Sequence, residues 1–213
     1  SILSNHITPP RRDYVIQIHM VRTDDGTGAG RTIAQIRSEI TNFVNPYFNN
    51  NTLNASFVEC GPEMYHNSSK YYNLSGKSEG HDMADDYNVA NVLNIYFVND
   101  PDGACGWARF PSDPEDYIVI AYACATNQST LVHEIGHYFD VYHTHETSFG
   151  AESVTRNNAD ACYDCDVDGD LLCDTDADPR LNQSGVSISA SPGCSITNMT
   201  HSDACGGVTY TPD

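Results

Sequence analysis

Short runs of apolar and β-branched residues mark the predicted strands of this chain. Residues 14–21 are mostly apolar, which is typical of a strand that is buried on one or both faces. Four later runs of similar length are separated from one another by polar or proline-containing stretches. We predict strands over all of these runs, at residues 53–60, 93–98, 105–110 and 117–123.

Apolar residues spaced three and four apart predict the helices. Residues 32–45 carry such a stripe, and Pro46 should end this helix because the residue before a proline is pushed away from helical angles. A short helix is expected over residues 85–92, and residues 61–80 are expected to form a long surface loop. Helices alternating with strands indicate an α/β fold with a mixed sheet on which helices pack. Beyond residue 143 this pattern dissolves.

A third helix, from about residue 129 to 139, carries the strongest chemical signal. Positions i and i+4 of a helix share a face, so His133 and His137 are able to bind one metal ion together, with Glu134 beside them. His143 would lie about 240° further round a continuing helix. The helix must therefore end near Asp140 and turn sharply if His143 is to join the site. Aspartate tolerates the left-handed conformation that such a turn often uses.

These residues predict a catalytic zinc site. Three neutral imidazoles, from His133, His137 and His143, leave a fourth position on zinc open for water. Zinc lowers the pKa of that water to about 7, and Glu134 would take its proton as it attacks a peptide carbonyl. A motif of two histidines and a glutamate recurs by chance, and buried histidines on a core helix are the structural alternative. The third histidine at this offset favours the zinc site.

Composition and charge narrow the class of protein. The chain has 213 residues and a net charge of −19, which argues against nucleic acids and anionic membranes as partners. Eight cysteines, an even number, indicate disulfides and an oxidising compartment. No apolar run approaches the ~20 residues of a membrane-spanning helix, and the first residues do not read as a signal peptide. We expect a secreted, trimmed monomer with no membrane or nucleic-acid contact.

The chain resembles the pappalysin family of metzincin zinc endopeptidases over nearly its full length. The likeness runs through residues 106–111, 118–120 and 130–134 into the zinc helix, and continues with His143-Thr144. Further matches lie in the region of the family's calcium loop and Met-turn and at the start of its last helix, at residues 169–170, 174–175, 198–199, 203–205 and 210–213.

The resemblance implies one catalytic domain over residues 1–213. Its upper lobe, residues 1–143, would hold a twisted mixed five-stranded sheet with two long helices. Its lower lobe, residues 144–213, would be irregular, stabilised by disulfides and calcium, and would stop before the last helix. Substrate would bind in extended form along an edge strand near residues 106–110. Family members are usually made as zymogens with an inhibitory prosegment.

Two positions depart from the family pattern. The glycine of the family's zinc motif is Asp140 here, which strains the turn modestly. The tyrosine that usually follows the Met-turn methionine by two residues is His201 here. The resemblance implies that Met199 forms an apolar floor beneath the zinc ligands and that His201 stands where the family stabilises the transition state. An imidazole is able to donate that hydrogen bond or to ligate the metal.

An acidic loop over residues 164–170 is a candidate calcium site, because hard oxygen ligands at this density favour calcium. An EF-hand is disfavoured, because Thr175 stands where its final glutamate should be. The alternative is a solvated acidic loop without a bound ion. The spacing and the resemblance together give as candidate ligands Asp166, Asp168, Asp170, Asp174 and Thr175.

The cysteines divide into one predicted pair and an open set. Cys105 and Cys124 bracket two predicted strands, so we expect them to bond to each other. The pairing of the others stays open, because eight cysteines allow 105 connectivities.

The sequence thus predicts a secreted zinc metalloendopeptidase. The alternatives are a catalytically inactive, calcium-stabilised extracellular binding or adhesion module, and a protease from another metzincin branch. Intact Glu134 disfavours the binding module, which has no need of that residue.

Overall fold

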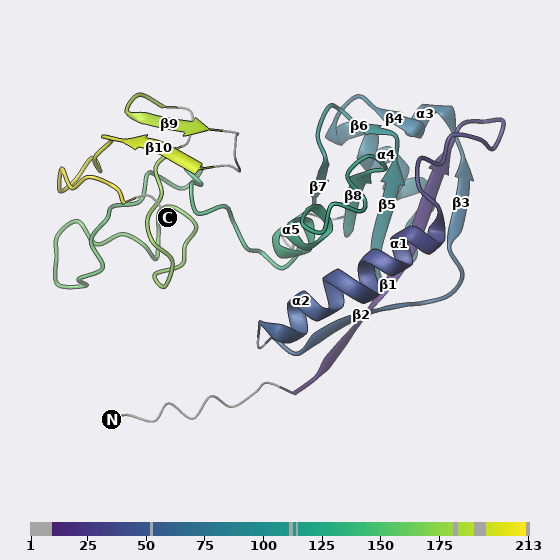
Figure 1. The fold of residues 1–213 in the computed structure, drawn as a ribbon, viewed down its shortest axis with the longest axis horizontal. Helices are drawn as coiled ribbons and strands as arrows, with labels where there is room; N and C mark the ends of the chain where they lie inside the picture. Colours follow the sequence, from purple (N-terminus) through teal and green to yellow (C-terminus); the bar gives the residue numbers. More distant parts are fainter. Residues whose placement is uncertain are drawn as a thin grey trace. The chain divides into compact units, whose positions relative to one another are not determined.

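A computed structural model describes residues 10–51, 53–110, 113, 115–180, 183–189 and 195–211. The chain divides into two compact units, residues 1–140 and 141–213 (Figure 1). The change of unit therefore falls three residues before the lobe boundary expected at residue 143.

Six strands form the sheet of the first unit: β1 (Arg12–Arg22), β2 (Ala55–Glu59), β3 (Met64–Asn67), β5 (Leu93–Val98), β7 (Gly106–Ala108) and β8 (Tyr117–Ala121). The order is β2-β1-β5-β8-β7, and all neighbours are parallel except β7, which runs antiparallel to β8 at the edge. All five predicted strands are present. The additional strand, β3, pairs with the later half of β1 while β2 pairs with its earlier half. The mixed sheet is therefore five positions wide.

The first long helical stretch extends past its predicted end. It consists of α1 (Ile33–Glu39), the π-helical segment η1 (Ile40–Val44) and α2 (Asn45–Asn50). The prediction that Pro46 helps to end the helix near residue 45 is wrong. Pro46 occupies the first turn of α2, where a missing N–H is tolerated, and the Asn45 N–H reaches back five residues to the carbonyl of Ile40.

The predicted loop over residues 61–80 is also wrong. Besides β3, this stretch holds α3 (Ser69–Tyr72), β4 (Asn73–Leu74) and the start of α4 (Lys77–Tyr87), which overlaps only the first residues of the helix predicted at 85–92. β4 pairs with β6 (Asp100–Pro101) in a small second sheet. Polar residues dominate this stretch, and its few buried side chains, among them Tyr71 and Leu74, do not form a regular apolar pattern that would predict a helix or strand.

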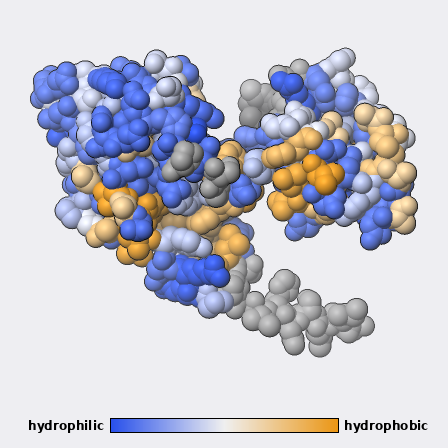
Figure 2. Space-filling model, turned by 180° about the vertical axis from the view of Figure 1, so that it is seen from behind, coloured by the Kyte–Doolittle hydropathy of each residue, from blue (hydrophilic) through white to orange (hydrophobic). Residues whose placement is uncertain are grey.

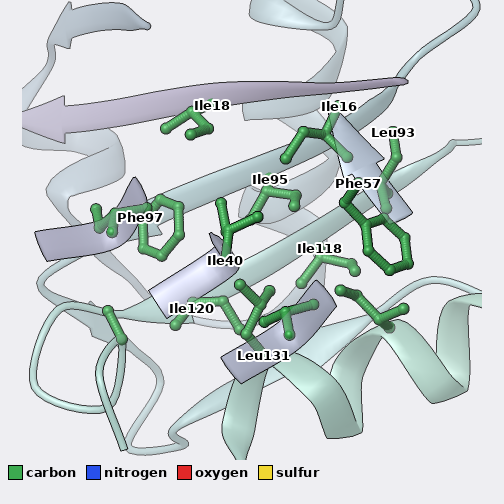
Figure 3. Packing of buried hydrophobic residues seen from close by; sticks show 14 of the residues in the cluster. Ile16, Ile18, Ile40, Phe57, Leu93, Ile95, Phe97, Ile118, Ile120 and Leu131 are labelled. Carbon is green, nitrogen blue, oxygen red and sulfur yellow. The ribbon is translucent and has the colours of Figure 1, made fainter. Parts of the chain in front are cut away.

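Apolar side chains cover both faces of the large sheet, because successive strand residues point to opposite faces. One face, with Ile16, Ile95 and Ile118, packs against the long helical stretch and against Leu131 of α5 (Thr130–Tyr138) (Figure 3). The other face packs against α3 and α4 through a second apolar cluster that includes Met83. The sheet is thereby held between two helical layers.

The second unit has little regular structure, as predicted. Its described strands are β9 (Val186–Ser189) and β10 (Ser195–Met199), an antiparallel pair. Two disulfides close its loops, Cys162–Cys205 and Cys165–Cys173. The buried carboxylate of Asp203 accepts hydrogen bonds from the backbone N–H groups of Val154, Gly206 and Val208. Covalent links and side-chain-to-backbone hydrogen bonds therefore take over the role that strand ladders have in the first unit.

The surface of the first unit is mostly polar. Hydrophilic residues cover most of the first unit in the view of Figure 2, with smaller hydrophobic patches between them. Within the described part of the chain, no helix has the length and apolar character needed to cross a bilayer.

Candidate metal centre and active site

Helix α5 begins at a well-satisfied turn. The Asn127 side-chain oxygen accepts hydrogen bonds from the N–H groups of Ser129 and Thr130, at 3.2 and 2.8 Å. The Gln128 N–H, one residue earlier, donates to the buried carboxylate of Glu39 at 2.7 Å. These bonds satisfy backbone donors that a helix start leaves free, and they attach α5 to the long helical stretch.

The helical period decides which side chains of α5 are buried. Leu131 and Ile135, four residues apart, pack into the core below the sheet. His133 lies about 200° round the helix from Leu131 and is exposed, whereas Glu134 lies only about 60° away and is buried. The Nε2 atoms of His133 and His137 come within 3.0 Å of each other.

The chain then turns as the spacing of the motif predicts. Asp140 has a φ of +69°, in the left-handed region, and its N–H donates to the carbonyl of His137 at 2.9 Å. Beyond this turn, ring nitrogens of His133, His137 and His143 all lie within 4.8 Å of one another. The donor set fits a metal ion that prefers imidazole nitrogen, because three such atoms at this separation are able to ligate one ion.

Glu134 is a buried carboxyl with a raised pKa. Its side chain is 5% exposed, and burial raises the pKa of its carboxyl to about 7, with the positive charge of Lys77 acting in the opposite direction. A bound divalent cation would also favour the charged carboxylate. A buried carboxyl that titrates near neutral pH is suited to act first as a base and then as an acid.

The edge strand β7 lies beside α5 (Figure 1). The structure pairs Cys105, just before this strand, with Cys124, three residues before Asn127. Just beyond β7, the Phe110 ring lies 5.5 Å from the ring of His137, measured between centroids. Gly106 lies so close to α5 that a side chain there would contact Glu134. The edge strand and the residues just beyond it therefore lie against Glu134, the predicted general base, and His137, a predicted metal ligand.

The other predicted site residues lie in the second unit. The His201 ring stacks on Tyr210, with centroids 5.8 Å apart, and Met199 is the last residue of β10. Asp170 is buried and accepts hydrogen bonds from Thr175 Oγ1 and from the Leu172 N–H, both at 2.9 Å.

The candidate calcium ligands are not gathered as the histidines are. Over the residues that the structure describes, the three histidines are the one group of His, Cys, Asp and Glu side chains close enough to share an ion. The calcium set of Asp166, Asp168, Asp170, Asp174 and Thr175 stays a prediction.

Sequence reasoning missed three residues around α5. Asn127 carries the usual chemistry of a helix cap but stands three residues before the helix. Gly106 lies inside a predicted strand, where a glycine often marks close backbone approach, so a signal was present. Nothing in the sequence indicated that Phe110 would contact His137.

Comparison with known proteins shows the fold. Mature mirolysin of Tannerella forsythia, solved with a cleaved peptide, is 19% identical, with 95% of this chain and 88% of that one covered and a TM-score of 0.52. A mirolysin structure with compound 9 (19% identity, 67% and 69% covered, TM-score 0.48) and metalloproteinase-II of Bacteroides fragilis (17%, 80% and 51%, TM-score 0.37) are less similar. No protein-family model matched the sequence, and no curated protein did. The chain therefore has a metzincin-like mixed α/β fold.

Proposed function

We propose that this protein is a secreted zinc-dependent endopeptidase of the metzincin type, close to the pappalysin branch. The observation that carries the proposal is the convergence of three imidazoles beside a buried carboxyl that titrates near neutral pH. Three disulfides within the described residues support an extracellular setting. Mirolysin, similar in fold, was solved with a cleaved peptide, which supports a peptide as the substrate class.

The chain's own residues divide the work of peptide hydrolysis. His133, His137 and His143 would hold the zinc ion, which when bound supplies Lewis acidity toward the scissile carbonyl and toward water. Glu134 takes a proton from the attacking water and passes it to the departing amine. The exposed backbone edge of β7 binds the substrate in extended form, so that main-chain hydrogen bonds provide affinity with little demand on sequence.

Three further parts of the proposal concern regulation and the second unit. The protein is a monomer made as a zymogen, and its prosegment is removed before activity. His201 donates a hydrogen bond to the transition state; His201→Ala tests this, and an unchanged kcat/KM would exclude it. The acidic loop binds calcium, which the density of carboxylates over residues 164–170 supports.

The test is cleavage of a peptide mixture derived from a whole proteome. Zinc-loaded wild-type protein should generate new termini, and both a zinc chelator and Glu134→Gln should abolish them. Glu79→Gln is the matched control, because Glu79 accepts a hydrogen bond from the Ser75 N–H, which a glutamine oxygen is also able to accept. Cleavage that persists in Glu134→Gln would exclude the mechanism. Zinc bound without any cleavage would instead favour a non-catalytic binding module.

A further inference from the structure

Gly106 occupies a position where a side chain has no room. A methyl group on its Cα would lie 2.7 Å from the backbone oxygen of Val119, 3.0 Å from Cδ1 of Ile120 and 3.2 Å from Cγ of Glu134. The first two atoms belong to the neighbouring strand β8 and the third to the predicted general base. The space next to Gly106 is therefore enclosed by β8 on one side and by Glu134 on the other.

Close approach, not backbone conformation, accounts for glycine at this position. The φ angle of Gly106 lies outside the left-handed region, so other residues are able to adopt it. Within a strand, glycine weakens pairing and gives no side chain to pack, and it often marks a point where another group comes near. Here the group that comes near is the side chain of Glu134.

The residues that follow on the same face of the edge strand fit this reading. Side chains two apart in a strand point the same way, so Gly106 and Ala108 lie on one face of β7, and Phe110 follows just past its end. Ala108 belongs to the apolar cluster that includes Leu131 and Ile135 of α5, and Phe110 lies against His137. The strand therefore has no side chain at the position nearest Glu134 and a small one at the position that packs with Leu131 and Ile135.

We propose that Gly106 is a positioning residue for Glu134, because the absence of a side chain there lets the carboxyl reach the place from which it acts. The inference rests on the proposed peptidase function. The edge strand would then have two roles: its backbone binds the substrate, and Gly106 leaves the space that determines where the Glu134 carboxyl lies. A displacement of Glu134 by a few tenths of an ångström should then lower kcat.

The test is Gly106→Ala in the full chain, with Gly61→Ala as the matched control. Gly61 has nothing within 4 Å of the position of an added methyl group, and its φ angle is not left-handed. Both variants should bind zinc like the wild type in a chelator competition. We expect Gly106→Ala to lower kcat about tenfold with a much smaller change in KM, while Gly61→Ala keeps both values. An unchanged kcat in Gly106→Ala would overturn the proposal.

A double-mutant cycle with Glu134→Ala gives a readout that does not depend on activity. Glu134→Ala removes the Cγ atom that the new methyl group would meet. If Gly106 acts through Glu134, Gly106→Ala should shift the urea midpoint clearly less in the Glu134→Ala background than in the wild type. Equal shifts would mean that only β8 opposes the methyl group, which would overturn the inference.

The cycle also separates the two possible failures. The Val119 oxygen opposes the methyl group in both backgrounds, so its share of the destabilisation cancels in the cycle and the difference between the two midpoint shifts reports the contact with Glu134 alone. If the wild-type protein has no peptidase activity, the proposed function fails, and the midpoints still decide whether Gly106 and Glu134 are coupled.

Discussion

Lowering the pH from 7.5 to 5 should destabilise the first unit, because two buried histidines are held neutral in the folded chain. His19 on β1 is fully buried and His66 on β3 is 8% exposed. Nδ1 of His19 lies 2.9 Å from Nε2 of His66, and Nε2 of His19 lies 2.9 Å from the side-chain oxygen of Asn94. That oxygen also accepts the Val89 N–H. Nε2 of His19 must therefore carry the proton and donate it to Asn94, and Nδ1 accepts from His66.

This arrangement has no place for a second proton on His19. A proton on Nδ1 of His19 would face the N–H of His66, so that two donors would oppose each other. Burial also disfavours a positive charge on either ring. The pKa of each histidine is accordingly lowered from 6.5 to about 4, chiefly by burial. Above pH 6.5 both histidines are neutral in the folded and the unfolded chain, and the free energy of unfolding has its full value. As the pH falls from 6.5 toward 4, only the unfolded chain takes up protons on them, so the free energy of unfolding decreases. At pH 5 each histidine costs about 2 kcal/mol, so the coupled pair should cost about 2–4 kcal/mol.

The assay is urea unfolding of metal-free protein at pH 7.5 and pH 5, with a chelator present so that metal release adds nothing. The comparison is a double variant, His19→Phe with His66→Phe, which keeps the rings that stack on Tyr96 and Tyr87. The loss of unfolding free energy between the two pH values should be about 2–4 kcal/mol smaller in the variant than in the wild type. Equal losses in the two proteins would refute the reasoning.

Three further changes should alter stability. Replacing both Cys105 and Cys124 by serine removes a disulfide that joins residues 19 positions apart and so restores conformational freedom to the unfolded chain. The unfolding free energy from urea titrations should fall by about 3 kcal/mol, and no change would contradict this argument. Asp140→Gly removes the strain of a side chain at a left-handed position and should raise the unfolding free energy by about 0.5–1 kcal/mol, measured as a higher Tm. A lower Tm would show that the Asp140 carboxylate stabilises the turn. Asp203→Ala leaves the Val154 N–H without its acceptor and should lower the unfolding free energy by about 1–3 kcal/mol. The Val154 amide should then exchange its hydrogen faster, and an unchanged exchange rate would contradict this prediction.

The fold of the first unit was largely predictable, because its strands are short, apolar and bounded by polar residues. The period of two in the strands and of three to four in the helices follows from burial on a defined face, and burial leaves its mark in the sequence. The errors came where local rules compete. Pro46 is a helix breaker by rule, yet a wider turn just before it allowed the helix to continue. Residues 61–80 are polar, and their short elements exist only because a few side chains pack onto a sheet built by distant residues.

The site was predictable as far as it is local. Two histidines and a glutamate on one helix fix their mutual placement by helical geometry, and the left-handed Asp140 follows from the need to bring back His143. The contact of Gly106 with Glu134 joins residues 28 positions apart, and no local pattern expresses it. The second unit was less predictable still, because its disulfides and the hydrogen bonds of Asp203 depend on chain crossings that leave no periodic signal.

The π-helical segment has a consequence for how the long helix tolerates insertions and deletions. Its core residues Ile36, Ile40, Val44 and Phe48 stand four apart, and all four are buried. In a regular α-helix each step of four overshoots a full turn by about 40°, so the last would be rotated about 120° from the first. The wider turn of η1 rotates less per residue and corrects this helical phase. Removing one residue from η1 would leave a regular α-helix in which Phe48 follows Ile36 by about three whole turns, only about 20° out of phase, so Phe48 would still face the sheet. One further deletion or an insertion would turn it away.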